Sequence, residues 1–206
     1  MRFVITGGGT AGHINPALAV AQELGSLGHE VRYAGKPGSL EARLVPEQGL
    51  EFVEFETAGF NRRKPWTLAT STIKIAASSR KARKWLKAYK PDAVIGFGGY
   101  VSIPVGLAAS QENIPLIVHE QNSASGMANR FLAKRAQLVA LSYAAAENDF
   151  KTRGEVVVTG NPVRAELHDI DTKVAREFFD IPAEAVVLLA FGGSLGARHI
   201  NERLIA

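Results

Sequence analysis

Short apolar runs alternate with longer amphipathic stretches over about the first 160 residues of the chain. The runs are rich in β-branched and large apolar residues and are bounded by glycine, proline or charged residues, which is typical of strands. They predict strands at residues 2–6, 30–34, 51–55, 93–95, 116–118, 138–141 and 156–158. Apolar strands separated by helical stretches indicate an α/β fold with a mainly parallel sheet.

The stretch between the first two strands has the period of a helix, because apolar residues recur every three or four positions from 14 to 24. Asn15 is the predicted N-cap, Pro16 the predicted first helical residue and Gly28 the predicted stop. Repetition of this strand–turn–helix unit predicts a doubly wound, Rossmann-like sheet with helices on both faces. Right-handed crossovers then place every strand-to-helix loop along one edge.

The pattern changes near residue 160, where the sequence GNPVR ends the last of these strands. We expect one domain at residues 1–163 and, at 164–206, a linker with the incomplete start of a second Rossmann-like domain. That second part is predicted to contain a helix at 172–179, a strand at 186–191 and a further helix. Asp169-Ile170-Asp171 has the form of a metal-binding D-x-D element, but no strand precedes it, so we interpret Asp171 as a helix cap.

Composition narrows the classes of function. The chain has no cysteine, which excludes disulfides and thiol nucleophiles. No apolar run of about 18 residues and no cleavable signal pattern occur, so we expect a protein that is neither membrane-spanning nor exported. Residues 61–90 carry ten basic residues and no acid, whereas the rest of the chain has 14 basic and 20 acidic residues. Such a segment favours an anionic partner. The basic residues are Arg62, Arg63, Lys64, Lys74, Arg80, Lys81, Arg83, Lys84, Lys87 and Lys90.

Glycine-rich turns follow three of the predicted strands, at residues 7–12, 96–99 and 192–196. Glycine lets the backbone approach a ligand closely, and the N-terminus of the next helix favours a phosphate or diphosphate. Close packing between strand and helix is the alternative explanation for any one turn. Gly7, Gly9 and Gly12 also match G-x-G-x-x-G, so a dinucleotide-dependent oxidoreductase is an alternative, although no acid ends the second strand and Lys36 follows it.

Five motifs in order are more specific than any single turn: GGGTAGH at 7–13, AYKPDAVIGFGGYVS at 88–102, HEQN at 119–122, GNPVR at 160–164 and GGSLGAR at 192–198. Together they closely resemble the MurG family. The resemblance implies the amino-terminal domain of a metal-independent, cofactor-free, inverting glycosyltransferase of the B fold. Such an enzyme moves N-acetylglucosamine from UDP-N-acetylglucosamine to the 4-hydroxyl of undecaprenyl-diphosphate-linked N-acetylmuramyl pentapeptide in peptidoglycan synthesis, as a peripheral protein on the cytoplasmic face of the bacterial cell membrane.

Two residues are candidates for the catalytic base. His13 follows the first glycine turn at the carboxyl edge of the sheet, where an imidazole can remove a proton from a hydroxyl or position a sugar. A structural histidine is the alternative. Glu120 follows the strand at 116–118 and is an alternative base, a group that orients His13, or a helix-capping acid.

Seven residues are candidates for substrate contacts. Thr10, Ala11 and Gly12 are expected to meet a diphosphate or sugar through backbone N–H groups, although Ala11 stands where many relatives have glycine. Asn122 is expected to bind the donor sugar. Tyr100 is interpreted as an acceptor contact or as packing. The resemblance places Arg164 and Ser194 near the nucleotide.

The basic segment at 61–90 mixes Leu68, Ile73, Ile75, Trp85 and Leu86 with its cations, which favours a helix lying on anionic lipid or, alternatively, a solvated helix face. Nucleic-acid binding is not expected, because no stacking platform accompanies the charge. Other functions that stay open are transfer to another acceptor and a non-catalytic binding module. We expect the 206-residue chain to be inactive alone.

Overall fold

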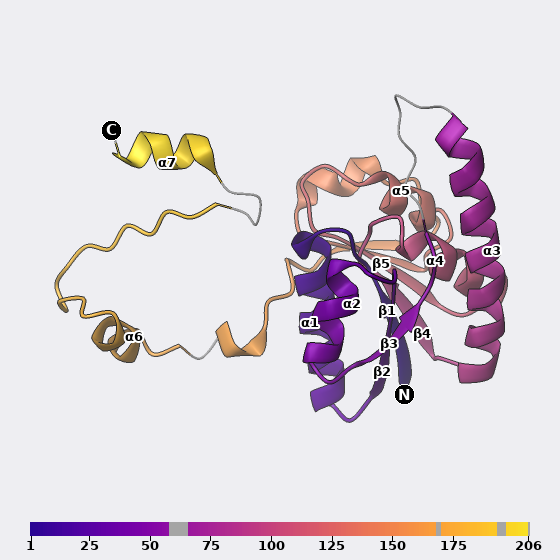
Figure 1. Cartoon of the computed structure of the whole chain (residues 1–206), viewed down its shortest axis with the longest axis horizontal. Coiled ribbons are helices and arrows are strands. Elements are labelled where there is room, and N and C mark those ends of the chain that lie inside the picture. Colours follow the sequence, from indigo (N-terminus) through magenta and orange to yellow (C-terminus); the bar gives the residue numbers. More distant parts are fainter. Residues whose placement is uncertain (58–65, 168–169, 193–196, 206) are drawn as a thin grey trace. The chain divides into compact units, whose positions relative to one another are not determined.

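A computed structural model describes residues 1–57, 66–167, 170–192 and 197–205 (Figure 1). The chain divides into two compact units, Met1–Arg164 and Ala165–Ala206. Among the described residues, no helix is long and apolar enough to cross a membrane.

A parallel sheet forms the centre of the first unit, and in the described residues it has seven strands in the order β3-β2-β1-β4-β5-β6-β7. All seven strands predicted from the sequence are confirmed, with ends that shift by one or two residues. The strands are β1 (Arg2–Thr6), β2 (Glu30–Gly35), β3 (Glu51–Glu54), β4 (Ala93–Gly96), β5 (Leu116–Glu120), β6 (Leu138–Leu141) and β7 (Glu155–Val158).

The order of the strands reverses between β1 and β4. From β1 the chain builds outward through β2 to β3, then returns to β4 on the other side of β1 and continues to β7. Ligands of doubly wound proteins bind at such a switch point, outside the carboxyl ends of the strands. Two of the predicted glycine turns, at 7–12 and 96–99, follow β1 and β4 at this position.

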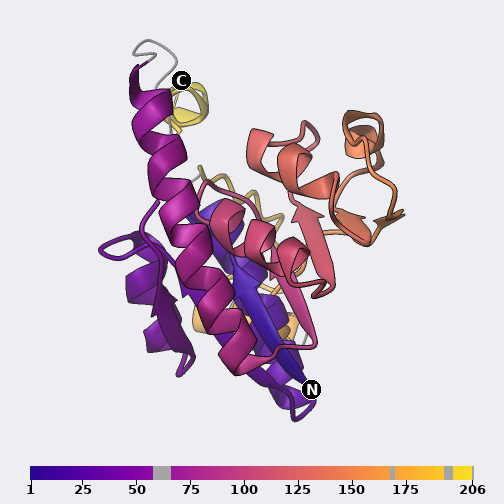
Figure 2. The ribbon, with the colours of Figure 1, turned by 90° about the vertical axis from the view of Figure 1, so that its right-hand side faces the viewer.

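Helices cover both faces of the sheet, each over its own core (Figures 1 and 2). Side chains of a strand alternate between the faces, so Val4 and Val94 lie in one core while their neighbours Ile5 and Ile95 lie in the other. Figure 2 shows α3 and α4 side by side over the first of these faces. The helices of this unit are α1 (Ala11–Ser26), α2 (Leu40–Glu47), α3 (Trp66–Tyr89), α4 (Ser102–Gln111) and α5 (Met127–Ala133), with short 3-10 turns η1 (Ala144–Asp149) and, in the second unit, η2 (Ala165–Leu167).

The start of α1 differs from the prediction. The helix begins at Ala11, with Thr10 as an extended N-cap (φ −145°, ψ 153°), so Asn15 is not the cap and Pro16 lies inside the helix. The helix starts earlier because the glycine turn ends at Thr10, whose carbonyl already accepts the N–H of Ile14 at 3.2 Å. The predicted stop is confirmed, since Gly28 follows the helix with φ 78°.

The second unit confirms one prediction and contradicts another. Helix α6 (Thr172–Phe178) is present, and the Asp171 carboxylate caps it by accepting the Lys173 N–H at 2.7 Å. A further helix, α7 (Arg198–Ile205), follows. The predicted strand at 186–191 is wrong, because this segment is irregular and Val186 is 99% exposed. A strand needs a neighbour to pair its N–H and C=O groups, and the described part of this unit contains no other strand.

Candidate active site

The two glycine turns at the switch point contact each other. The Gly8 N–H donates to the Gly98 carbonyl at 3.3 Å, and a β-carbon at Gly99 would clash with the Gly8 carbonyl. The buried hydroxyl of Tyr33, on the neighbouring strand β2, donates to the Gly7 carbonyl at 2.9 Å. Burial, and to a lesser degree a nearby carboxylate, raises the pKa of Tyr33 well above its usual range, so the phenol stays a hydrogen-bond donor.

Glu41, which the sequence analysis did not single out, holds the first turn in place. It lies in the first turn of α2 and is 1% exposed. Its carboxylate accepts the Gly9 N–H at 3.2 Å and the Lys36 N–H at 3.4 Å. A glutamate at the start of a helix ordinarily complements the helix dipole, so nothing in the sequence distinguished it. A β-carbon at Gly8 would clash with this carboxylate, so Glu41 packs closely against the first turn.

The hydrogen bonds of His13 define its tautomer. Nδ1 lies 3.0 Å from the Gly8 carbonyl oxygen and 3.1 Å from the Thr10 hydroxyl oxygen. A carbonyl oxygen only accepts, so Nδ1 of the neutral ring carries the proton and donates it. Nε2 is then an unprotonated acceptor on the side of the ring that packs against Gly98. The turn therefore presents a basic nitrogen at the carboxyl edge of the sheet.

His13 lines two clefts. The smaller has a volume of about 160 Å³ and is shared with Tyr100 and Asn129. The larger has a volume of about 510 Å³ and is lined by Thr10, Lys36 and Tyr100 among others. Three residues that were predicted separately as site residues, Thr10, His13 and Tyr100, thus line one cleft. Lys36 brings a positive charge to the larger cleft.

The HEQN motif lies partly inside the sheet, which corrects an expectation. Strand β5 continues through Glu120 instead of ending before the motif, so His119 and Glu120 are buried. His119 bridges two loops, because Nε2 lies 3.2 Å from the Gly160 carbonyl and Nδ1 lies 2.9 Å from the Gln121 amide nitrogen. Burial lowers the pKa of His119, partly offset by the Gly160 hydrogen bond and the Glu120 charge. The surroundings of this histidine therefore favour its neutral form.

The Glu120 carboxylate, 1% exposed, accepts four hydrogen bonds. Oε1 takes the backbone N–H of Asn122 at 3.0 Å and its side-chain amide at 2.9 Å. Oε2 takes the Gly126 N–H and the Asn129 amide, both at 2.9 Å. Because four donors already occupy this carboxylate, a role in positioning Asn122 and the start of α5 fits it better than a role as a base.

The remaining predicted contacts occupy different places. Ala11 and Gly12 form the first turn of α1, where backbone N–H groups lack intrahelical acceptors. Asn122 is exposed beyond β5. Arg164 is exposed at the end of the first unit. Ser194 lies outside the described residues, and its role and that of Arg164 stay predictions.

Comparison with known proteins agrees with this architecture. A model of the glycosyltransferase family 28 N-terminal domain matches residues 3–141, which run from β1 to the end of β6. The crystal structure of MurG from Acinetobacter baumannii superposes with a TM-score of 0.73 at 33% identity, covering 98% of this chain and 55% of that one. The sheet and its helices are thus the Rossmann-like N-terminal fold of the B-type glycosyltransferases, as predicted.

Curated relatives carry a specific name. The chain is 42% identical to the UDP-N-acetylglucosamine--N-acetylmuramyl-(pentapeptide) pyrophosphoryl-undecaprenol N-acetylglucosamine transferase of Acetivibrio thermocellus, over 98% of this chain and 55% of the relative. It is also 42% identical to the protein of that name from Halothermothrix orenii, over 100% of this chain and 56% of the relative. The chain spans about half the length of these relatives. Because the family model covers most of the first unit, the chain belongs to glycosyltransferase family 28 and contains the N-terminal domain of that family.

Proposed function

We propose that this chain forms the acceptor-binding part of an inverting N-acetylglucosaminyltransferase of peptidoglycan synthesis. The donor is UDP-N-acetylglucosamine, and the acceptor is the 4-hydroxyl of undecaprenyl-diphosphate-linked N-acetylmuramyl pentapeptide. The names of relatives that match nearly the whole chain at 42% identity support this donor and acceptor. The clefts at the switch point, lined by His13, supply a site for the acceptor sugar.

The contact between His13 Nδ1 and the Gly8 carbonyl oxygen, 3.0 Å apart, is the observation that carries the proposal. The Gly8 carbonyl fixes the proton on Nδ1, so Nε2 accepts a proton from a hydroxyl placed in the cleft. When Nε2 has taken the proton of the hydroxyl, the ring carries a positive charge, and the Gly8 carbonyl stabilises that charge. The Thr10 hydroxyl oxygen, 3.1 Å from Nδ1, is a second acceptor for the same N–H group. Both groups hold the ring in one orientation before the substrate arrives.

The reaction then follows from the roles of these groups. Nε2 of His13 removes the proton as the acceptor oxygen attacks the anomeric carbon, on the face opposite the diphosphate. The bond to UDP breaks and its electron pair leaves with the diphosphate. Because the attack comes from the opposite face, the anomeric centre is inverted. We assign Asn122, held by Glu120, to the donor sugar. Arg164 and Ser194 are proposed to stabilise the departing diphosphate.

The main competing function is disfavoured by Glu41. A dinucleotide-binding protein places the pyrophosphate of its cofactor on the N–H groups of the first glycine turn. Here the Gly9 N–H is already bound to the buried Glu41 carboxylate, and this charge would repel a pyrophosphate bound directly on the turn. Transfer to a different acceptor stays the alternative within the family.

We also propose that α3 brings the protein to an anionic membrane surface, so that the enzyme is a peripheral protein of the cytoplasmic face of the cell membrane. Ile73, Arg80 and Lys84 recur at helical spacing, and all three are exposed, with Ile73 70% exposed. Cations beside an exposed apolar side chain suit the headgroup region of anionic lipid. Arg62, Arg63 and Lys64 of the basic segment lie outside the described residues.

Part of the predicted lipid-facing set serves the core instead, which is a correction. Leu86 is fully buried against the sheet. Trp85 stacks on Tyr89 with ring centroids 5.7 Å apart and packs on Phe55 at 5.5 Å. About half of the surface of a helix that lies on a sheet is in contact with that sheet, so only the residues on its outward side can meet a membrane.

Sugar transfer tests the proposed function. Radiolabelled UDP-N-acetylglucosamine and the lipid-linked acceptor are supplied to this chain and to the same chain extended to the length of its relatives. We expect product only from the extended protein, and we expect His13→Ala to reduce its turnover by about 10²-fold or more. His29→Ala, which changes a histidine at the opposite edge of the sheet before β2, is the matched control and should stay near wild type. Wild-type turnover in His13→Ala would refute the assigned base.

A further inference from the structure

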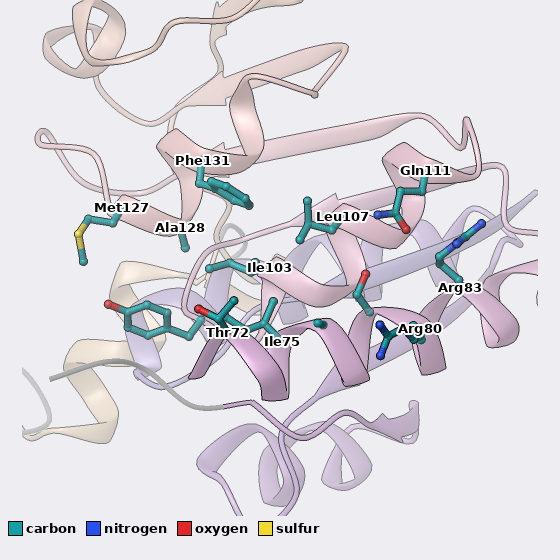
Figure 3. A pocket seen from close by; sticks show the side chains of 13 residues that line it. Thr72, Ile75, Arg80, Arg83, Ile103, Leu107, Gln111, Met127, Ala128 and Phe131 are labelled. Carbon is teal, nitrogen blue, oxygen red and sulfur yellow. The ribbon is translucent and has the colours of Figure 1, made fainter. Parts of the chain in front are cut away.

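An open apolar groove runs between α3, α4 and α5 (Figure 3). Its volume is about 630 Å³, within the range of sites that hold small ligands. Ile75 of α3, Leu107 of α4 and Phe131 of α5 line it, and Phe131 is 39% exposed. Neither the base nor the glycine turns use these side chains. Apolar side chains from three helices thus face a common space that the core does not fill.

The two ends of the groove differ in character. Figure 3 shows Arg80 and Arg83 at one end and Met127 at the other. Met127 and Tyr100 also line the small cleft of His13. The groove therefore opens beside the proposed catalytic base at one end and beside the basic face of α3 at the other.

We propose that this groove binds the hydrocarbon chain of the lipid acceptor. The phosphate end of the lipid lies toward His13, and the rest of the chain leaves past Arg80 toward the membrane. This inference rests on the proposed function and adds a binding site for the lipid part of the substrate.

The chemistry of the groove favours a single hydrocarbon chain over other occupants. Ile75, Ile103 and Leu107 lie along the walls between the two ends, where Thr72 and Ser79 are the polar neighbours, so an occupant there gains mainly by leaving water. A sugar or an extended peptide carries many more polar groups than these few could pair, and would leave most of them without a hydrogen bond. At the outer end, Arg83 is paired with Glu112, with 2.7 Å between Nη2 and Oε1, whereas Arg80 is exposed and supplies the cation of the rim. A chain that comes from an anionic bilayer meets that charge first.

The length of the hydrocarbon chain provides the test, because each buried methylene tightens binding about fourfold. Binding of inorganic diphosphate, geranyl diphosphate and farnesyl diphosphate to this chain is measured by calorimetry, with each probe below its micelle concentration. We expect farnesyl diphosphate to bind at least about tenfold more tightly than geranyl diphosphate, and inorganic diphosphate to bind weakest. Equal affinity for the three probes would overturn the proposal.

Two neighbouring alanines of α3 give a matched pair of variants. Ala76 lines the groove and is exposed, so Ala76→Phe fills the space without removing core atoms. Ala77 is also exposed but lies about 100° further round the helix, outside the residues that line the groove. We expect Ala76→Phe to weaken farnesyl diphosphate binding by at least about tenfold and Ala77→Phe to change it less than about threefold, with unchanged melting temperatures for both.

Other results would separate this inference from the proposed function. If Ala76→Phe weakened adsorption to vesicles but left farnesyl diphosphate binding unchanged, the groove would be a bilayer contact and the inference would be wrong. The binding assay contains no sugar donor, so its outcome does not depend on catalysis. If the extended protein transfers sugar but the affinity for the three diphosphates does not depend on hydrocarbon length, only the proposal for the groove is refuted. Chain-dependent binding without transfer in the extended protein would support the groove and refute the proposed function.

Discussion

The imidazole of His13 packs directly against the backbone of Gly98. A β-carbon at Gly98 would lie 3.1 Å from Cδ2 and 3.2 Å from Nε2 of the ring, tighter than most real contacts. Gly98 also has φ 97°, a conformation that side chains disfavour. The second glycine turn thus fixes the position of the nitrogen that we assign as the base.

Gly98→Ala should therefore reduce sugar transfer by the extended protein. The added methyl group pushes the ring away from the cleft, and we expect turnover to fall by about tenfold or more, since small displacements of a catalytic group are costly. The backbone strain should also lower the free energy of unfolding by about 1–3 kcal/mol. Steady-state kinetics and urea unfolding measure the two effects.

Gly28→Ala is the matched control for this variant. Gly28 has φ 78°, but a β-carbon there would meet no atom within 4 Å, and the residue lies beyond the far end of α1 from His13. The control should lose similar stability and keep its turnover. If both variants lost turnover equally, strain and not the position of His13 would explain the effect.

Glu41 should contribute to stability through the first glycine turn. Glu41→Ala leaves the N–H groups of Gly9 and Lys36 without their acceptor, so we expect the free energy of unfolding to fall by about 1–3 kcal/mol. Glu41→Gln keeps one acceptor oxygen and should lose less. Glu47→Ala changes an exposed acid of the same helix and should stay within about 0.5 kcal/mol of wild type. Equal stability of the two alanine variants would refute this role.

Glu120→Gln distinguishes an orienting carboxylate from a catalytic base. An amide turns its NH₂ group toward two of the four donors, such as Asn122 or Asn129, so stability should fall by about 1–3 kcal/mol. If Glu120 only orients Asn122, turnover falls but the acidic limb of the pH–rate profile keeps its wild-type midpoint. Loss of that limb would make Glu120 the base.

The fold could be predicted from the sequence because its pattern is strong and local. Runs such as Arg2–Thr6 and Leu138–Leu141 are apolar, β-branched and bounded by turn residues, and each forms a strand. The strand predicted at 186–191 failed because an apolar run becomes a strand only beside a partner, which local pattern does not reveal.

The site was only partly predictable for a similar reason. The glycine turns and His13 can be recognised in the sequence, since few residue types suit those positions. Glu41 and Asn129 act through hydrogen bonds that join residues distant in sequence, such as Glu41 to Gly9. Their spacing carries no signal. Pro16 misled the prediction because proline is favoured at a helix start, whereas the glycine turn set the start of α1 five residues earlier.

Buried His119 should make the stability of the first unit depend on pH. Its pKa is lowered in the folded state by burial, whereas the unfolded chain protonates near pH 6.5. Stability from this residue is therefore complete above about pH 6.5, and falls as the pH drops from there to the lower folded pKa, because the unfolded chain then binds more protons. We expect His119→Asn to lose less unfolding free energy than wild type between pH 8 and pH 5.5. His199→Asn, which changes an exposed histidine, should retain the wild-type dependence.

The charges that meet the membrane should be those on the outward face of α3. Lys81 donates to the Glu54 carbonyl at 3.0 Å, and Lys87 pairs with Glu112 at 3.3 Å, so these two cations are already engaged by the protein. Arg80 and Lys84 are both exposed and share the outward face. Their removal should therefore weaken adsorption to anionic lipid more than loss of the same charge elsewhere.

Sedimentation with vesicles tests this difference. Each cation near an anionic surface contributes about 1 kcal/mol, so Arg80→Gln with Lys84→Gln should weaken binding to phosphatidylglycerol or cardiolipin vesicles by about tenfold or more. Lys151→Gln with Arg153→Gln removes the same charge from exposed positions before β7 and should have a small effect. Neutral vesicles should bind weakly, and added salt should release the protein as the screening length shortens. If the two double variants bound equally, net charge and not α3 would govern adsorption, and the proposed membrane face would be wrong.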